Sequence, residues 1–191
     1  MHYQGRLSSK EPTWYSQQVR RDVPSVAADW LFDEESLTAK LIRTCQRRCD
    51  GRFSVKVIRQ YWGRPFYSER KLLSMRRGEM AFIREVKLHC NDNEWVFART
   101  LIPAGSFTGK ARRLAFLGNK PLGAVLFADR ASHRRLMQFA VMQPTHEIYR
   151  HALSAPESTS EVIWGRRTVF VYGGKPLLVN EIFLPKLLEA S

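Results

Sequence analysis

Cysteine and long apolar runs are both scarce in this 191-residue sequence. The three cysteines, Cys45, Cys49 and Cys90, show no disulfide-rich spacing, so we expect core-packing thiols in a reducing compartment. No apolar run approaches the roughly 20 residues of a membrane-spanning helix. The N-terminus also lacks the apolar stretch of a secretory signal. These absences predict a cytoplasmic protein without stable insertion into a membrane.

The motifs of common enzyme and nucleic-acid-binding classes are absent as well. The sequence has neither a phosphate-binding glycine loop nor a G-x-S-x-G turn, and its five histidines do not fall at metal-ligand spacings. Cys45 and Cys49 lie four residues apart but lack further matching ligands, so they make a poor zinc site. No zinc finger or RNA-binding aromatic motif is present. The sequence therefore predicts no metal site.

Acidic residues are outnumbered, since 31 lysines and arginines against 18 acidic residues give a net charge of +13. Such a surplus is found in proteins that bind nucleic acid or an anionic surface, and also in proteins that attract a small anionic ligand. The adjacent arginine pairs are scattered along the chain and do not form one block. A solvated basic surface is the simplest interpretation, and we expect no nucleic-acid partner.

The chain length fits a single domain. Residues 1–24 are polar and aperiodic, so we expect a loosely attached extension, with residues 25–191 forming the domain. Ser36 is a plausible N-cap, and the apolar residues that follow it repeat every four positions from Leu37 to Cys49. Helices are expected over 37–49, 109–117 and 131–141.

Alternation of apolar and polar residues predicts several strands. Strands are expected over 52–62, 80–90, 95–101, 166–172 and 175–184. Gly173-Gly174 joins the last two and is a favoured hairpin dipeptide, and a two-residue turn there would place Arg166 opposite Glu181. Strands joined by hairpins, with helices between them, predict an α+β fold with a single antiparallel β-sheet flanked by helices.

The stretch MAFIREVKLHCNDNEWVFARTLIP predicts the clearest hairpin. If residues 91–94 form its loop, Val86 pairs with Arg99. Register decides which face of a sheet a side chain occupies, so Arg84 and Arg99 would both point into the core as diagonal neighbours. The opposite face, which carries Glu85, would be exposed to water.

A third inward charge lies in the last strand, where Glu181 shares an apolar face with Val179 and Phe183. A buried charge without a partner is costly. In one interpretation Arg84, Arg99 and Glu181 neutralise one another inside the core. In the other they line a mostly apolar pocket, where the surplus positive charge suits a carboxylate ligand.

Four blocks of sequence carry a resemblance to a known family: DWLFDEESLT, IREVKLHCNDNEWVFARTLIP, LGNKPLGAVLF and WGRRTVFVYGGKPLLVNEIFLP. On these residues the chain resembles the chorismate pyruvate-lyases, which supply 4-hydroxybenzoate for ubiquinone biosynthesis. The resemblance implies removal of the enolpyruvyl side chain of chorismate as pyruvate, without metal or cofactor. It also implies an internal ligand site covered by helical flaps.

The resemblance further implies roles for particular residues. The family's carboxylate-binding arginine falls on Arg84 and its site glutamate falls on Glu181, and these two would be the catalytic residues. Main-chain contacts to the ligand fall on Leu37 and Leu122. Arg99 matches a family arginine near the site and would have a secondary role in binding substrate. The expected partners are chorismate and 4-hydroxybenzoate, bound by a monomer.

The chain departs from the family's pattern at two places, which bear on the flaps and on product release. The N-terminal extension and the segment between LFADR and WGRR are longer than is usual in the family. The same fold also serves as the effector-sensing domain of some transcription regulators, so a non-catalytic domain that binds small carboxylates is the alternative. Such regulators need a DNA-binding domain, and the N-terminal extension shows no helix-turn-helix pattern.

Overall fold

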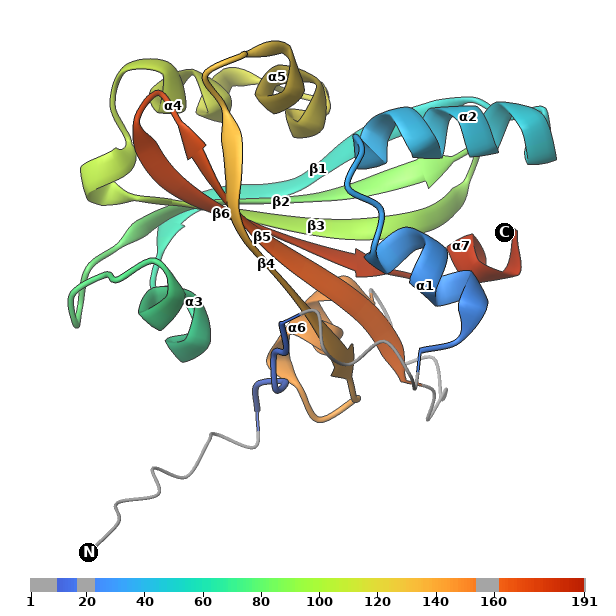
Figure 1. The fold of residues 1–191 in the computed structure, drawn as a ribbon, viewed down its shortest axis with the longest axis horizontal. Coiled ribbons are helices and arrows are strands. Elements are labelled where there is room, and N and C mark those ends of the chain that lie inside the picture. Colours follow the sequence, from blue (N-terminus) through green and yellow to red (C-terminus); the bar gives the residue numbers. More distant parts are fainter. Residues whose placement is uncertain (1–9, 17–22, 154–161, 191) are drawn as a thin grey trace, which may run out of the picture.

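The computed structural model describes residues 10–16, 23–153 and 162–190, and within them the chain forms one six-stranded antiparallel sheet (Figure 1). The strands are β1 (Phe53–Gly63), β2 (Ala81–Cys90), β3 (Asn93–Pro103), β4 (His133–Met142), β5 (Ile163–Tyr172) and β6 (Lys175–Phe183). The helices are α1 (Ser25–Leu31), α2 (Leu37–Cys49), α3 (Tyr67–Leu72), α4 (Gly109–Arg113), α5 (Leu122–Ala128), α6 (Glu147–Ala152) and α7 (Pro185–Glu189). The predicted α+β class is confirmed.

Two segments singled out in the sequence fall partly outside these residues. Residues 1–9 and 17–22 of the predicted extension lie outside the described part of the chain. The same is true of residues 154–161, in the long segment before WGRR. The predicted boundary between extension and domain therefore stays a prediction.

Two three-stranded meanders make up the sheet. The strand order is β1-β2-β3-β6-β5-β4, so the first meander meets the second at β3 and β6. Helices α2 and α5 lie over one face, called the front face here, while α3 and α6 lie over the other, the back face (Figure 1). Because successive residues of a strand alternate between faces, every strand contributes side chains to both.

Helix α2 forms where the sequence predicts it. The Ser36 hydroxyl accepts a hydrogen bond of 3.4 Å from the backbone N–H of Ala39, which is an N-cap interaction. The apolar stripe that includes Leu37, Leu41 and Cys45 is buried. Packing of this stripe holds the helix, and the loop that precedes it, over the front face.

A two-residue turn joins β5 to β6 and sets their register. Gly173 and Gly174 have φ angles of 59° and 73°, a left-handed conformation that glycine adopts without steric cost. With this turn Arg166 pairs with Glu181. The predicted pairing of these two residues is confirmed.

The turn between β2 and β3 is tighter than predicted. Cys90 pairs with Asn93 across a two-residue turn, where a four-residue loop was expected. A β-bulge near the end of β2 then adds one residue to β3. The shorter turn moves the register by two residues and the bulge restores one, so the predicted pairing is wrong by one residue.

This shift reverses the face on which Arg99 lies. Arg99 pairs with Glu85, whereas the sequence predicted a pair with Val86, and Arg84 pairs with Thr100. The expectation that Arg99 points inward beside Arg84 is therefore wrong. Arg84 faces the front of the sheet and Arg99 faces the back.

The back face of β2 was expected to be exposed to water, but it is buried. Glu85 is 1% exposed and Lys87 is 2% exposed. Helices α3 and α6 cover this side of the sheet, and residues 10–16 add to the cover through two backbone hydrogen bonds of 2.8 Å between Tyr15 and Phe139. The described part of the predicted extension is thus attached to the domain.

The helix predicted over 131–141 is wrong, because these residues lie almost entirely in strand β4. Leucine, methionine, glutamine and alanine in this stretch favour a helix locally. Strand β4 instead pairs with β5 from His133 opposite Val171 to Met142 opposite Ile163. The hydrogen bonds and packing of the sheet edge override the local preference.

The prediction of free thiols is wrong for Cys45 and Cys90, and the prediction of core packing is wrong for Cys49. Cys45 in α2 and Cys90 at the end of β2 form a disulfide. Cys49 is an exposed free thiol. The bond fastens the C-terminal half of α2 to the sheet, at the end of the helix away from Leu37.

Breaking this disulfide should destabilise the protein. The bonded residues are 45 positions apart, and in the chain-entropy treatment closure of such a loop corresponds to about 4 kcal/mol. We expect Cys45→Ala to lower the free energy of unfolding by roughly 2–4 kcal/mol in urea denaturation without reductant. Cys49→Ala is the matched control and should not change the midpoint. An identical wild-type midpoint with and without dithiothreitol would contradict this expectation.

Candidate active site

A cavity lies between the front face of the sheet and helices α2 and α5. Its lining includes Arg84 from β2, Glu181 from β6, and Leu37 and Leu122, the first residues of the two helices. The structure thus brings together four of the five predicted site residues. Arg99 does not line the cavity.

Arg84 is a buried cation that forms no ion pair with any residue in the described part of the chain. It is 2% exposed, and its Nη2 donates to the carbonyls of Gly118 at 2.8 Å and Lys120 at 3.2 Å, in the segment before α5. Its Nε is buried and has no hydrogen-bond partner among the described residues. Burial lowers the pKa of Arg84 to about 10, so the guanidinium stays charged at neutral pH. A carboxylate ligand would satisfy both the charge and the free N–H.

Arg166 holds Glu181 at the cavity wall. Its Nε donates to Glu181 Oε2 at 2.5 Å, and its Nη1 donates to the carbonyls of Trp30 at 3.1 Å and Asp33 at 2.6 Å. These bonds join β5, β6, the end of α1 and the loop between α1 and α2. The second oxygen of the Glu181 carboxylate accepts no hydrogen bond from a described residue, which leaves it available to a ligand.

A third arginine in the lining, Arg134 of β4, was missed by the sequence analysis. Its Nη1 donates to the carbonyl of Glu34 and its Nη2 donates to that of Glu35 at 2.9 Å, in the loop before α2. The guanidinium carbon lies 4.9 Å from the ring centroid of Phe127 and 5.7 Å from that of Phe170. The mistaken helix assignment concealed this residue, because only a strand at the sheet edge directs it to the front face.

The cavity carries a surplus of two positive charges. Three arginines, Arg84, Arg134 and Arg166, line it together with one carboxylate, that of Glu181. The remaining lining is mostly apolar, with threonine hydroxyls at three positions. Mostly apolar walls with a few convergent charges are the usual form of a small-ligand site. In an enclosed space of low dielectric, this surplus favours a ligand with two negative charges.

The ends of two helices close one side of the cavity. Leu37 and Leu122 begin α2 and α5, and the backbone N–H groups of a first helical turn have no acceptor within the helix. The helices approach closely here, because a Cβ added at Gly123 would lie 2.9 Å from Thr38 Oγ1. These N–H groups fit the main-chain contacts that the family resemblance implies. The opening of the two helices as flaps stays a prediction.

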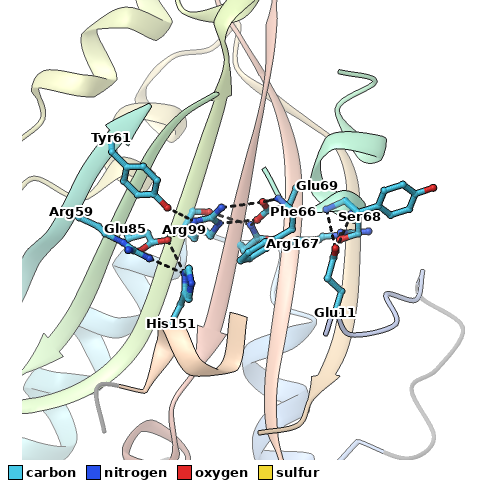
Figure 2. Close-up of polar contacts among 12 residues, drawn as sticks. Glu11, Arg59, Tyr61, Phe66, Ser68, Glu69, Glu85, Arg99, His151 and Arg167 are labelled. Atoms are coloured by element: carbon cyan, nitrogen blue, oxygen red, sulfur yellow. Dashed lines mark hydrogen bonds and ion pairs between the residues drawn. The ribbon is translucent and has the colours of Figure 1, made fainter. Parts of the chain in front are cut away.

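Arg99 belongs to a network behind the sheet, which we call the back-face cluster and define as Arg59, Glu69, Glu85, Arg99 and His151 (Figure 2). Arg99 is 1% exposed, and it donates to both carboxylate oxygens of Glu69, at 3.0 and 3.3 Å, and to Glu85. Its predicted place at the ligand site is therefore corrected: both of its charge partners are protein carboxylates on the back face.

The charges of the back-face cluster are compensated from within. Arg59 Nε donates to Glu85 at 2.5 Å, and His151 Nδ1 lies 3.2 Å from the same carboxylate. Burial raises the pKa of Glu85, but hydrogen bonds from His151 and Arg59 and the charge of Arg99 outweigh burial and lower this pKa to about 2. A network satisfied in this way supports the sheet and leaves no charge for a ligand.

The antiparallel sheet, with a positively charged cavity on one face, defines an α+β protein whose cavity has the charge to suit a small anion. Among residues 10–16, 23–153 and 162–190 no three His, Cys, Asp or Glu side chains gather as a metal site, and no helix has the length and apolarity to cross a bilayer.

A GntR-family transcriptional regulator from Bacillus cereus shares the fold, with a TM-score of 0.51 at 9% identity over 70% of this chain and 92% of that chain. A gene product of Staphylococcus aureus has a TM-score of 0.51 at 12% identity over 81% and 91% of the two chains. Identities this low show the fold alone.

Sequence comparison narrows this class to one family. The chorismate lyase family model matches residues 9–191. A probable chorismate pyruvate-lyase from Methylococcus capsulatus is 41% identical over 84% of this chain and 95% of that protein. Another from Aromatoleum aromaticum is 37% identical over 96% of this chain and 98% of that protein. The chain belongs to the chorismate lyase family, which confirms the resemblance seen in its sequence.

Proposed function

We propose that the protein is a chorismate pyruvate-lyase, which converts chorismate into 4-hydroxybenzoate and pyruvate. The observation that carries this proposal is the cavity with two surplus positive charges, because chorismate has two carboxylates. Membership of the chorismate lyase family supports it. In this proposal the 4-hydroxybenzoate serves ubiquinone biosynthesis, and the protein acts as a monomer in the cytoplasm.

Arg84 binds the ring carboxylate of the substrate. Its buried Nε–H has no acceptor among the described residues, and a carboxylate supplies one. The bonds to the carbonyls of Gly118 and Lys120 already hold the guanidinium in place, so little ordering is required when the ligand binds. The backbone N–H groups of Leu37 and Leu122 provide further donors on the helical side of the cavity.

The reaction requires orientation and charge stabilisation more than a strong acid or base. The ring C–O bond breaks, and its electron pair leaves with the enolpyruvyl oxygen. The ring carbon that bears the hydroxyl loses its hydrogen as a proton, and the enol takes up a proton as it becomes pyruvate, so atoms and charge balance. Because the ring becomes aromatic, much of the driving force is intrinsic to the substrate. The cavity must hold the substrate and stabilise the charge that develops on the leaving oxygen.

Glu181 accepts a hydrogen bond from the ring hydroxyl. Arg166 donates to one oxygen of the Glu181 carboxylate and compensates its charge, while the other oxygen remains for the ligand. The group is thus positioned by the protein before the substrate arrives. We assign to Glu181 hydrogen bonding to the substrate rather than proton transfer.

Turnover of chorismate is the direct test. Purified protein incubated with chorismate and no added metal should release 4-hydroxybenzoate and pyruvate in equal amounts, followed by chromatography and by a coupled pyruvate assay. EDTA should leave the rate unchanged. Absence of turnover, with or without EDTA, would overturn the lyase proposal. Binding of 4-hydroxybenzoate without turnover would instead identify a non-catalytic carboxylate-binding domain, and tight, salt-sensitive binding of generic duplex DNA would identify a nucleic-acid-binding protein.

Replacement of Arg84 should impair activity, whereas replacement of Arg99 should impair folding stability. Arg84→Ala removes a charge-assisted contact to substrate, so we expect kcat/KM to fall by about 10²-fold with little change in stability. Arg99→Ala leaves Glu69 buried without a cation and Glu85 with Arg59 as its remaining cation, so we expect a loss of roughly 3–5 kcal/mol in the free energy of unfolding. Steady-state kinetics and urea denaturation of both variants measure the two effects. Equal, small losses of activity per folded molecule would show that Arg84 is the wrong arginine.

Replacement of Glu181 separates hydrogen bonding from proton transfer. Glu181→Gln keeps a polar group of the same size, and we expect kcat/KM to fall by about tenfold, the size of one hydrogen bond to a charged group. General acid or base catalysis contributes about 10²–10⁴-fold, so a loss in that range would assign proton transfer to Glu181. Glu189→Gln, at an exposed position of α7, is the matched control and should retain the wild-type rate.

A further inference from the structure

We propose that Arg134 forms a second carboxylate subsite, which binds the enolpyruvyl carboxylate of chorismate and makes the cavity selective for a dicarboxylate. This inference rests on the proposed function and assigns a substrate contact to an arginine outside the pair formed by Arg84 and Glu181. Three observations carry it: the place of Arg134 in the sheet, its unused hydrogen-bonding capacity, and the charge balance of the cavity.

Arg84 and Arg134 enter the cavity from distant strands. Arg84 lies on β2 and Arg134 on the edge strand β4, with β3, β6 and β5 between them. Four strand spacings separate the two backbones by about 19 Å, and both side chains reach inward to line the same cavity. Glu181 lies on β6, between the two. A ligand with one carboxylate at each end matches this arrangement, whereas a monocarboxylate occupies only one end of it.

The protein holds both arginines in the same way. Arg84 donates to two carbonyls of the segment before α5, and Arg134 donates to two carbonyls of the loop before α2. Each keeps a buried Nε with no hydrogen-bond partner among the described residues. A buried N–H without an acceptor is unfavourable, so each end of the cavity has a place for one acceptor. The two carboxylates of chorismate supply one acceptor group to each end.

Arg166 differs from these two arginines because its Nε already has an acceptor. Its Nε donates to Glu181, and its Nη1 donates to the carbonyls of Trp30 and Asp33. Because Glu181 compensates the charge of Arg166, the surplus charge of the cavity resides on Arg84 and Arg134. Burial and the nearby charge of Arg166 lower the pKa of Arg134 and outweigh the opposing charges of nearby carboxylates, so a bound carboxylate would further favour the charged guanidinium.

The surroundings of Arg134 explain why the leaving side chain, and not the ring carboxylate, belongs at this end. Phe127, which packs against the Arg134 guanidinium, is 46% exposed, whereas Arg84 at the other end is 2% exposed. The Arg134 end is therefore the more open one. A pyruvate formed there is nearer to solvent, while the aromatic product stays on Arg84. Cation–π contacts with Phe127 and Phe170 keep the guanidinium oriented before the substrate arrives.

A comparison of a dicarboxylate with a monocarboxylate tests the proposal. The KM for chorismate is measured by steady-state kinetics, and the Kd for 4-hydroxybenzoate, which lacks the second carboxylate, by calorimetric titration. Arg134→Gln should raise the KM for chorismate by about 10- to 100-fold, with little change in kcat or in the Kd for 4-hydroxybenzoate. Arg134→Lys keeps the charge and should raise the KM less. The exposed neighbour offers the matched control Arg135→Gln, which should leave all three quantities unchanged.

The remaining outcomes of these measurements have the following meanings for the role of Arg134. Equal weakening of chorismate and 4-hydroxybenzoate would mean that Arg134 only holds the loop before α2, and no change in either would mean that it does not contact the substrate. If the wild-type protein binds chorismate without turning it over, the lyase proposal fails, but the Kd values for the two ligands still decide the role of Arg134. If the wild type binds neither ligand, both proposals fall.

Discussion

The ion pair between Arg166 and Glu181 is the interaction on which the cavity depends. It forms because the glycine turn between β5 and β6 sets a register in which the two residues are direct cross-strand partners. The same arginine binds the carbonyls of Trp30 and Asp33, so it also positions the loop that leads into α2. That loop supplies the carbonyl acceptors of Arg134 and ends at the helix whose first residue lines the cavity. Arg166 thus links the register of β5 and β6 to the position of α2, which covers the site.

The sheet separates two polar layers with different charge balance. Neighbouring residues of one strand divide between them: Arg84 faces the cavity while Glu85 faces the back-face cluster, and Arg166 and Arg167 divide in the same way. Within the back-face cluster, cations and carboxylates compensate one another, which limits the cost of burying them. In front, two positive charges lack a protein partner, so the free protein carries an energetic penalty that an anionic ligand removes. Ligand binding and folding stability are therefore linked through the same charges.

Local patterns in the sequence predicted much of the fold and most of the site. The cap at Ser36, the periodicity of α2 and the glycine turn are determined by neighbouring residues, and they were predicted correctly. Arg99 was placed on the wrong face because a bulge depends on how two strands pair, which no local pattern reveals. Arg134 was missed because the residues around it favour a helix locally but form the edge strand β4. The Cys45–Cys90 bond joins positions that only the tertiary fold brings together.

The division of neighbouring residues between two faces also limits how such a chain can change during evolution. An insertion or deletion of one residue within β2, β3, β5 or β6 that no bulge accommodates would exchange the cavity set for the back-face set, and both layers would be lost in one event. Substitutions at these positions act one at a time and leave the other layer in place. Changes of length should therefore accumulate in the connections, such as the segment between β4 and β5, while the strands diverge only by replacement. We therefore expect the lengths of these strands to be conserved more strictly than the identities of their residues.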